Sequence, residues 1–291
     1  MKKNHKYFLW MTLAMIFWGA NWTGAKIIST YAPIQVLVFY RFLLSALAVV
    51  PIILYKRLSF KLPPDIWPIV IFSSVLMGLY QWFYFEGVHL GLAGVGGVLV
   101  TTLNPLMTFA IEAVIKRKVL EKRELIGLGL GVISAVFFLQ LWQFDLAQFW
   151  GSGTAYFFLA ALTWSMLSII GQHIKLSPIV YTFYVALLIA PVLLIGSDAH
   201  AVFSVFDFGA TFWFWMIFLS TLGYGFATTL FFLANQKLGA KTASSFLFLV
   251  PTSALLVAFF VLNEPLSIPT IIGGIFALTG VAVLNFKAVP E

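Results

Sequence analysis

The chain has 291 residues, of which 62% are hydrophobic and 9% are charged. Soluble domains carry roughly 25% charged residues, so this chain has too few charges to cover a water-facing surface and is expected to lie in a membrane. Its net charge of +7 does not indicate a nucleic-acid partner, because the basic residues gather on one side of the predicted membrane spans. The absence of cysteine excludes a disulfide framework and a thiolate metal site.

Ten apolar segments follow one another, with short polar or Pro/Gly-rich links between them. A hydrocarbon core of about 30 Å needs about 20 mostly apolar residues in a helix, and each segment is close to that length. We therefore expect an all-α integral membrane protein with ten transmembrane helices. In chain order, the helices are predicted at residues 7–29, 33–55, 66–88, 94–115, 124–141, 153–171, 178–196, 211–235, 242–262 and 268–286.

The second half of the chain repeats the first about 146 residues later. Residues 93–128 form an apolar run with an internal proline, a polar link and a glycine-containing apolar run. The same order recurs in 239–274, so that Pro105 corresponds to Pro251. An internal repeat of this kind decides the architecture.

The repeat divides the chain into two predicted domains, residues 1–145 and 146–291. Because each domain holds five spans, the second enters the membrane in the opposite sense to the first. The predicted architecture is therefore a 5+5 inverted repeat. Such repeats are common in secondary transporters, whose substrate sites lie near the membrane midplane between the repeats.

The basic residues predict which side of the membrane each link faces. Of the 17 Lys and Arg residues, all but Lys26 and Arg41 fall on the side that holds both termini. Cytoplasmic loops are rich in these residues, so the N-terminus and the C-terminus are both predicted to be cytoplasmic. The compact halves and short loops are typical of a multi-pass protein of the bacterial cytoplasmic (inner) membrane.

Polar and aromatic side chains share one face in several predicted spans. Buried amides and hydroxyls in a membrane need partners, so we expect these faces to point inward and to bind substrate. Aromatic walls with a few amides favour an amphipathic solute of amino-acid size over a highly charged phosphate ester. The candidate substrate-binding residues are Trp18, Asn21, Trp22, Gln81, Tyr84, Thr101, Asn104, Trp164, Tyr224, Thr228 and Ser244.

Three charged side chains at or near membrane depth are candidates for gating or coupling: Arg41, Glu86 and Glu112. A charge near the middle of a membrane costs at least about 2.5–3.5 kcal/mol. Arg41 has three alternatives: a structural ion pair, with Glu86 as the suggested partner, a substrate carboxylate site, or a gate. For each glutamate the alternatives are proton coupling and an ion pair, with Lys26 for Glu86 and with the basic cluster at 116–118 for Glu112.

Pro105 and Pro251 are the other candidate gating residues. Each removes one helical hydrogen bond, near the middle of a predicted span in corresponding parts of the repeat. A break of this kind is tolerated where neighbours or a cavity satisfy the freed carbonyl. The pair therefore predicts helix breaks beside a central cavity, and kinks that only improve packing are the alternative.

Several short motifs are spread over nearly the whole chain. They are PheTrpGlyAlaAsnTrp at 17–22 with Lys26 close behind, ArgPhe at 41–42, the two prolines, and AsnGluProLeu at 263–266 followed by IleGlyGly. Together they resemble the drug/metabolite transporter (DMT) superfamily, specifically its EamA-type branch with ten helices. The resemblance implies that the first, third, fourth, sixth, eighth and ninth helices line a central cavity. One departure is that Lys118 stands where the second half has Glu264.

The leading hypothesis is a secondary active transporter that exports amino acids or related small metabolites across the cytoplasmic membrane by alternating access. A multidrug or lipophilic-cation efflux carrier is the alternative in the same class. An enzyme and a cofactor or metal site are not expected, because no nucleotide-binding, HExxH or GxSxG motif is present. A channel, the third alternative, would need a continuous polar lining, whereas the proline-broken helices and aromatic walls favour a closed cavity. The expected partners are a small-molecule substrate, the lipid bilayer and a coupling proton or ion, with the chain as a monomer or homodimer.

Overall fold

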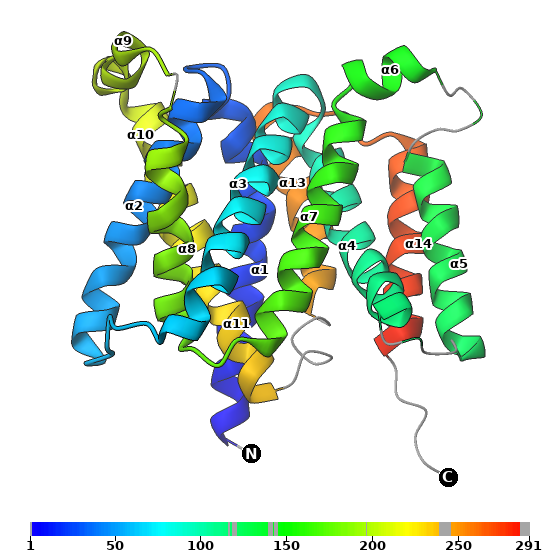
Figure 1. Cartoon of the computed structure of the whole chain (residues 1–291). Helices are drawn as coiled ribbons and strands as arrows, with labels where there is room; N and C mark the ends of the chain where they lie inside the picture. Colours follow the sequence, from blue (N-terminus) through cyan, green and yellow to red (C-terminus); the bar gives the residue numbers. More distant parts are fainter. Residues whose placement is uncertain are drawn as a thin grey trace.

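In the computed structural model every described element is helical, as the apolar pattern predicts. The structure describes residues 2–115, 117, 121–138, 142, 145–195, 197–238 and 246–285, and within these ranges it contains no strand. The helices form one bundle, in which the first helix begins and the last helix ends at the same, lower end in Figure 1.

The first half supplies five long helices at the predicted places. Proline marks the start of two of them: Pro33 directly precedes α2, and Pro64 opens the turn that leads into α3. Proline is favoured there because its missing N–H would have no helical partner in the first turn. The elements are α1 (Lys2–Ile28), α2 (Ile34–Tyr55), η1 (Pro64–Ile66), α3 (Trp67–Leu90), α4 (Ala93–Ile115) and α5 (Lys122–Phe138).

The second half again follows the predicted segments, with three additions. The short elements α6 (Leu146–Gly151), α9 (Ala199–Phe203) and η3 (Ser204–Asp207) lie between them, too short to give an apolar signal in the sequence. The helices α6 and α9 lie at the upper end in Figure 1. The other elements, which fall in the predicted segments, are α7 (Thr154–His173), α8 (Pro178–Val192), α10 (Ala210–Phe218), η4 (Leu219–Phe226), α11 (Ala227–Leu238), η5 (Phe246–Phe248), α13 (Leu249–Leu262) and α14 (Ile268–Asn285).

Length and composition fit a multi-pass membrane protein. Five described helical stretches are long and apolar enough to cross a membrane: Ile34–Tyr55, Pro64–Leu90, Ala93–Ile115, Thr154–Gly171 and Ala210–Ala234. Shorter apolar helices cover Pro178–Val192, Leu249–Leu262 and Ile268–Gly280. The count of ten spans and the cytoplasmic placement of both termini stay predictions.

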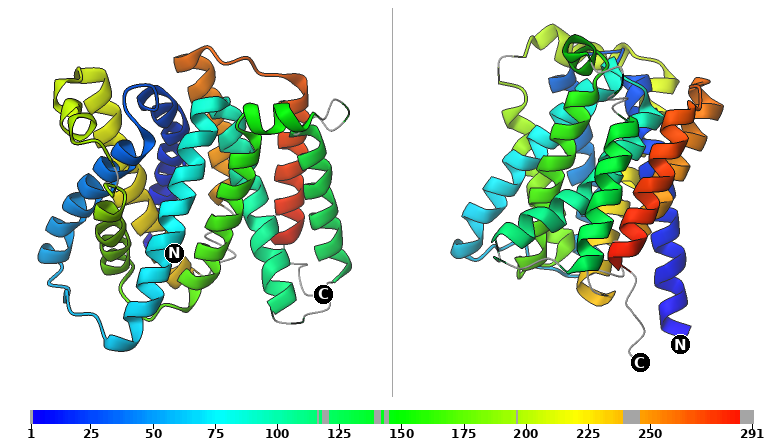
Figure 2. Two further views of the ribbon diagram at one scale, coloured as in Figure 1. Left: turned by 45° about the horizontal axis from the view of Figure 1, so that its top comes forward. Right: turned by 90° about the vertical axis from the view of Figure 1, so that its right-hand side faces the viewer.

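Exchange of the two halves preserves the main helix contacts. The pairs α2–α8, α4–α13 and α5–α14 map onto themselves, whereas the pair α1–α13 exchanges with α7–α4. The pair α3–α7 likewise exchanges with the contacts of α1 with η4 and α11. Because α1 begins at the lower end and α7 at the upper end, the halves run in opposite directions, and α5 and α14 stand together at one edge (Figures 1 and 2).

The two related prolines occupy unlike positions, which corrects the predicted pair of mid-helix breaks. The prediction placed Pro251 inside one helix over 242–262. In the structure α13 begins at Leu249, so Pro251 lies in its first turn, where the missing N–H breaks no helical hydrogen bond. Pro105 lies inside the continuous helix α4, and its side chain is outside the described residues.

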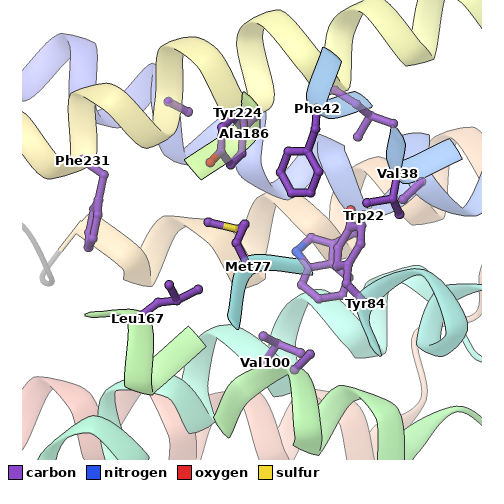
Figure 3. Packing of buried hydrophobic residues seen from close by; sticks show 14 of the residues in the cluster. Trp22, Val38, Phe42, Met77, Tyr84, Val100, Leu167, Ala186, Tyr224 and Phe231 are labelled. Carbon is purple, nitrogen blue, oxygen red and sulfur yellow. The ribbon is translucent and has the colours of Figure 1, made fainter. Parts of the chain in front are cut away.

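Small residues let α3 and α4 approach α7 closely. The ring of Phe157 is 1% exposed and occupies the space in which a Cβ at Gly87 or Gly96 would stand. Trp22 packs on the same ring, with centroids 5.8 Å apart. Figure 3 shows Trp22 and Tyr84 meeting in the core. Three helices thereby converge on one aromatic ring beside the centre of the bundle.

Candidate functional site

A cavity of about 60 Å³ lies between the two halves. Its walls come from α1 to α4 of the first half and from α7, η4, α11, η5 and α13 of the second. The cavity is thus a site to which both halves contribute.

Aromatic rings form much of the cavity wall, and they touch in series. Trp18 and Trp164, which correspond in the repeat, meet edge to face with centroids 5.8 Å apart. Trp164 lies 4.8 Å from Tyr80, which lies 5.9 Å from Tyr84. Trp22 extends the row, 4.5 Å from Tyr84. These rings offer a broad apolar surface with specific packing geometry, suited to the apolar part of a ligand.

Arg41 carries the one formal charge among the cavity-lining residues that the structure describes. Its side chain is 4% exposed, and Nη1 donates a hydrogen bond to Gln81 Oε1 at 2.9 Å. The guanidinium lies 5.4 Å from the ring centroid of Tyr84 and 5.7 Å from that of Phe85. These distances are typical of cation–π contacts. Within the described residues, these contacts of the charge are therefore all with neutral groups.

The partner suggested for Arg41 from the sequence, Glu86, is not its partner in the structure. Glu86 follows Gln81 by five residues on α3, which at 3.6 residues per turn turns it about 140° away around the helix axis. Glu86 is half-buried and is not among the residues that line the cavity. Its proposed part in coupling stays a prediction, and any such part would have to be played outside this cavity.

Three polar atoms of cavity-lining side chains have no hydrogen-bond partner. They are Asn21 Oδ1, Asn104 Nδ2 and Arg41 Nε, in side chains that are 4%, 6% and 4% exposed. Among the described residues, every other buried side-chain atom in this condition is a hydroxyl oxygen. A buried polar group left unpaired costs about 1–3 kcal/mol, so these three atoms are candidates for binding a polar ligand.

A π-helix, η4, forms the part of the cavity wall that packs against α1. Within η4, the carbonyl oxygen of Gly223 accepts a hydrogen bond from Trp18 Nε1 at 2.8 Å. Gly223 lies directly against the amide of Asn21 and leaves no room for a Cβ. Tyr224 follows at the cavity wall and is 3% exposed. The π-helical turn is rare and frequent at functional sites, and the uniform helix predicted over 211–235 did not include it.

The short link between α3 and α4 is held on one side by Lys26. The link backbone, residues 89–94, together with Lys26 and Glu264, is called the α3–α4 clamp below. Lys26 Nζ donates hydrogen bonds to the carbonyl oxygens of His89 and Gly91, both at 2.9 Å. These carbonyls stand at the C-terminal end of α3, where a positive charge is favoured by the helix dipole.

Glu264 holds the other side of the link. Its two carboxylate oxygens accept hydrogen bonds from the backbone N–H groups of Ala93 and Gly94, both at 2.8 Å. These groups open α4, where helical N–H groups have no partner in their own helix and a negative charge is favoured. Glu264 comes from the second half, so the clamp joins the two halves. The carboxylate of Glu264 also attracts Lys26 electrostatically.

A specific turn aims Glu264 at α4. Asn263 ends α13 in the left-handed region, with φ 54°, which Asn tolerates better than most residues. The N–H of Glu264 then reaches back to the carbonyl oxygen of Ala258 at 3.3 Å, one residue further than in a Schellman helix end, and a proline commonly follows a helix end of this kind. Arg117, the residue that corresponds to Asn263, also has a positive φ, 49°. The AsnGluPro motif is thus a helix stop that presents a carboxylate.

An aromatic layer separates the cavity from the clamp. Trp22, Tyr84 and Phe157 are each at most 3% exposed, and their rings are in contact. Tyr84 Oη donates a hydrogen bond to the carbonyl oxygen of Asn21 at 2.7 Å, which ties α3 to α1 at this level. The cavity is therefore closed toward the clamp end of the bundle.

The structure brings most of the predicted substrate-binding residues to this one cavity. Arg41, predicted for gating or coupling, lines it as well. Ser244 lies outside the described residues, as does the side chain of Glu112. Pro251 does not line the cavity, although its neighbour Val250 does. The predicted residues that line the cavity are Trp18, Asn21, Trp22, Gln81, Tyr84, Thr101, Asn104, Trp164, Tyr224 and Thr228.

Sequence reasoning missed five lining residues: Tyr80, Val100, Gly223, Leu247 and Val250. Tyr80 had a usable signal, because it lies four residues before Tyr84 and so shares its helix face. The apolar pair Leu247 and Val250 had none, since apolar residues fill the whole segment. The partner of Glu264 was also missed, although Asn followed by Glu and Pro after an apolar run is a readable helix stop.

Comparison with known proteins gives three findings. The family model of the EamA-like transporter family matches the chain twice, at residues 5–140 and 151–286. An uncharacterized transporter of Archaeoglobus fulgidus is 25% identical over 297 residues, covering 96% of this chain and 99% of that protein. A crystal structure of another protein superposes with a TM-score of 0.69 at 20% identity, covering 96% of each chain. At that identity the likeness concerns the fold alone.

Proposed function

Because this chain belongs to the EamA-like transporter family, a family of multi-pass membrane proteins, we propose that it is a secondary active transporter that works by alternating access. The central cavity is its substrate site. The finer reading is export of amino acids or related small metabolites across the cytoplasmic membrane of a bacterial host. The confirmed resemblance to the family supports the transporter class and leaves the substrate to the chemistry of the cavity.

The observation that carries the proposal is the set of unpartnered polar atoms at Asn21, Arg41 and Asn104, enclosed between the halves. Buried polar groups are almost always paired, and exceptions in a closed interior call for a reason. A solute with matching donors and acceptors supplies one. The aromatic wall beside them would hold the apolar body of the same solute.

The alternation itself is supported by the exchange symmetry of the helix contacts. The cavity is closed toward the clamp by Trp22, Tyr84 and Phe157. In inverted repeats, access alternates when one repeat or bundle rocks against the other around a fixed site. Opening toward the clamp end would require Glu264 to leave the start of α4, because this contact joins the two halves.

A reconstituted flux assay tests the proposal. The full chain in proteoliposomes should show saturable counterflow of at least one compound from a panel of amino acids, nucleosides, sugars and cationic drugs. The same compound should stabilise the purified protein, by about 2.7 kcal/mol at a hundred times its Kd. Flux that does not saturate and far exceeds carrier rates would show a channel, and absence of both flux and stabilisation across the panel would overturn the proposal.

A cysteine-labelling assay tests the site. The chain contains no cysteine, so single cysteines need no altered background. Asn21→Cys and Gln81→Cys should react with a small thiol reagent, and the transported compound should slow both reactions. Leu47→Cys serves as the control, because Leu47 is exposed on the outside of α2 and its labelling should not respond to that compound. Equal labelling with and without the compound at the first two positions would place the substrate elsewhere.

A further inference from the structure

The charge balance of the cavity indicates what kind of solute it accepts. Among its described lining residues there is one cation, Arg41, and no carboxylate. Among the described residues, the neighbours of the guanidinium include the neutral oxygen of Gln81 and the faces of Tyr84 and Phe85. A charge buried in a membrane protein is costly unless it is paired. A solute with a negative charge could therefore pair with Arg41.

The unpaired Nε of the guanidinium points to one particular kind of anion. Nη1 is engaged by Gln81, whereas Nε has no partner although the side chain is 4% exposed. The Nε–H and a terminal N–H on the same edge form the fork that takes both oxygens of a carboxylate. A single guanidinium matches one negative charge, so a phosphate ester with two charges is a poor fit.

The remaining groups describe the rest of the solute. Asn21 Oδ1 and Asn104 Nδ2 are neutral and unpaired, so they can hydrogen-bond an amine, a hydroxyl or a carbonyl group without requiring a charge there. The ring series from Trp18 to Trp22 offers an apolar wall. Because no lining carboxylate is present among the described residues, an ammonium group gains no ion pair.

We infer that the transported solute is a small monocarboxylate with an apolar or aromatic body, bound through its carboxylate by Arg41, and that an α-amino group is accepted but not required. The inference rests on the proposed function, because it names the substrate class of the same cavity. A site for lipophilic cations needs a negative partner, or an aromatic cage without a cation in its wall. The presence of Arg41 in this wall therefore disfavours such solutes.

Matched pairs of compounds test the inference. Each pair shares a body and differs in its charged end: 3-phenylpropionate with phenethylamine, and 4-methylpentanoate with 3-methylbutylamine, with phenylalanine and leucine as the zwitterions. The acids and zwitterions should stabilise the purified full chain and compete for flux. The amines should bind at least about 30-fold more weakly, the loss expected when a buried charge pair is removed. Equal or stronger binding of the amines, or no binding of any carboxylate, would overturn the inference.

Two variants connect the selectivity to Arg41. Arg41→Gln should lose carboxylate binding by about 30-fold or more. If that variant does not fold, Gln81→Glu keeps the arginine and places an internal carboxylate beside it. Gln81→Glu should weaken carboxylate binding at least about tenfold by occupying the guanidinium, and it should bring the amines closer to the acids in affinity. Carboxylate binding unchanged in Gln81→Glu would contradict the inference.

The outcomes keep the two proposals apart. If the wild-type protein carries only amines or neutral solutes from the wider panel, the transporter assignment stands and the carboxylate inference falls. If it carries nothing, both fall. Carboxylate transport that Arg41→Gln and Gln81→Glu leave unaltered would retain the transporter and remove Arg41 from recognition.

Discussion

The α3–α4 clamp and the central cavity are both polar places inside an apolar bundle, and they differ in how their polar atoms are paired. In the clamp, Lys26 donates to two carbonyl oxygens and Glu264 accepts from two N–H groups. In the cavity, Asn21, Asn104 and Arg41 each retain a buried atom without a partner. Paired groups lower the free energy of the folded state, whereas unpaired groups raise it. At the cavity, the proposed solute would supply the partners.

The difference between the clamp and the cavity can be measured through protein stability. Removing one member of a buried pair leaves its partner unsatisfied and destabilises the protein, whereas removing a group that is already unpaired does not. Substitutions in the clamp should therefore lower stability first. Substitutions of the unpaired cavity groups should lower ligand binding with little loss of stability.

The largest effect is expected at Glu264. Glu264→Ala leaves the N–H groups of Ala93 and Gly94 without acceptors in a buried place. At about 1–3 kcal/mol for each, stability should fall by about 2–6 kcal/mol, seen as a lower Tm of the purified protein and a lower folded yield. Glu264→Gln retains one carbonyl oxygen and should lose roughly half as much. A Tm of Glu264→Ala equal to that of the wild type would contradict the claim that the paired groups of the clamp stabilise the fold.

The clamp also shows where sequence reasoning stops. The helices could be predicted because apolar runs of sufficient length have few alternatives, and the cavity residues because polar side chains at helical spacing must face inward. The contact of Glu264 with Ala93 joins residues 171 positions apart. Its partner depends on how α13 and α4 pack, which no local pattern states. The same holds for Arg41 and Gln81, whose pairing is set by the packing of α2 on α3.

The π-helix η4 was missed for a different reason. Its residues, Leu219–Phe226, are less apolar than those of α10 and more apolar than those of α11, so composition does not distinguish a wide turn from an α-helical one. What sets η4 apart is the hydrogen bond from Trp18 to Gly223 and the amide of Asn21 against the glycine. Both are contacts with α1, so they appear only once the two halves are assembled.

A cavity variant with an intermediate effect is Gly223→Ala. The added methyl group would collide with the amide of Asn21, and overpacking of this kind costs about 1–3 kcal/mol. Because Asn21 must move, binding of the transported compound should weaken along with Tm. Gly129→Ala is the control, since a Cβ at Gly129 meets nothing within 4 Å and alanine favours the helix by up to about 1 kcal/mol. Equal behaviour of the two variants would show that Gly223 does not position Asn21.

The unpaired groups provide the sharpest test of the comparison. Asn104→Leu removes an unpaired amide of similar size, so stability should stay the same or rise by about 1 kcal/mol, while the Kd of the transported compound should rise about tenfold. Thr182→Val removes an unpaired hydroxyl that does not line the cavity. It should show the same small gain in stability and unchanged transport. A large loss of stability in Asn104→Leu would mean that its amide serves the fold.

The smallest effect is expected at Trp18. Trp18 lines the cavity, but its indole N–H is paired with the carbonyl oxygen of Gly223, as the polar groups of the clamp are paired. Trp18→Phe keeps a ring at the wall and removes one hydrogen bond, so stability should fall by about 1 kcal/mol, a decrease in Tm of roughly 2–4 °C for a protein of this size. Ligand binding should change only a few-fold.

Trp164 supplies the matched control for Trp18, because it occupies the corresponding place in the repeat and touches the same cavity. Within the described part of the chain, its indole nitrogen makes no hydrogen bond to protein. Trp164→Phe should therefore shift Tm less than Trp18→Phe does, although the two lose the same ring area. If both variants lost equal stability, the loss would come from ring packing, and pairing of polar atoms would not be what separates the supporting residues of this bundle from its binding residues.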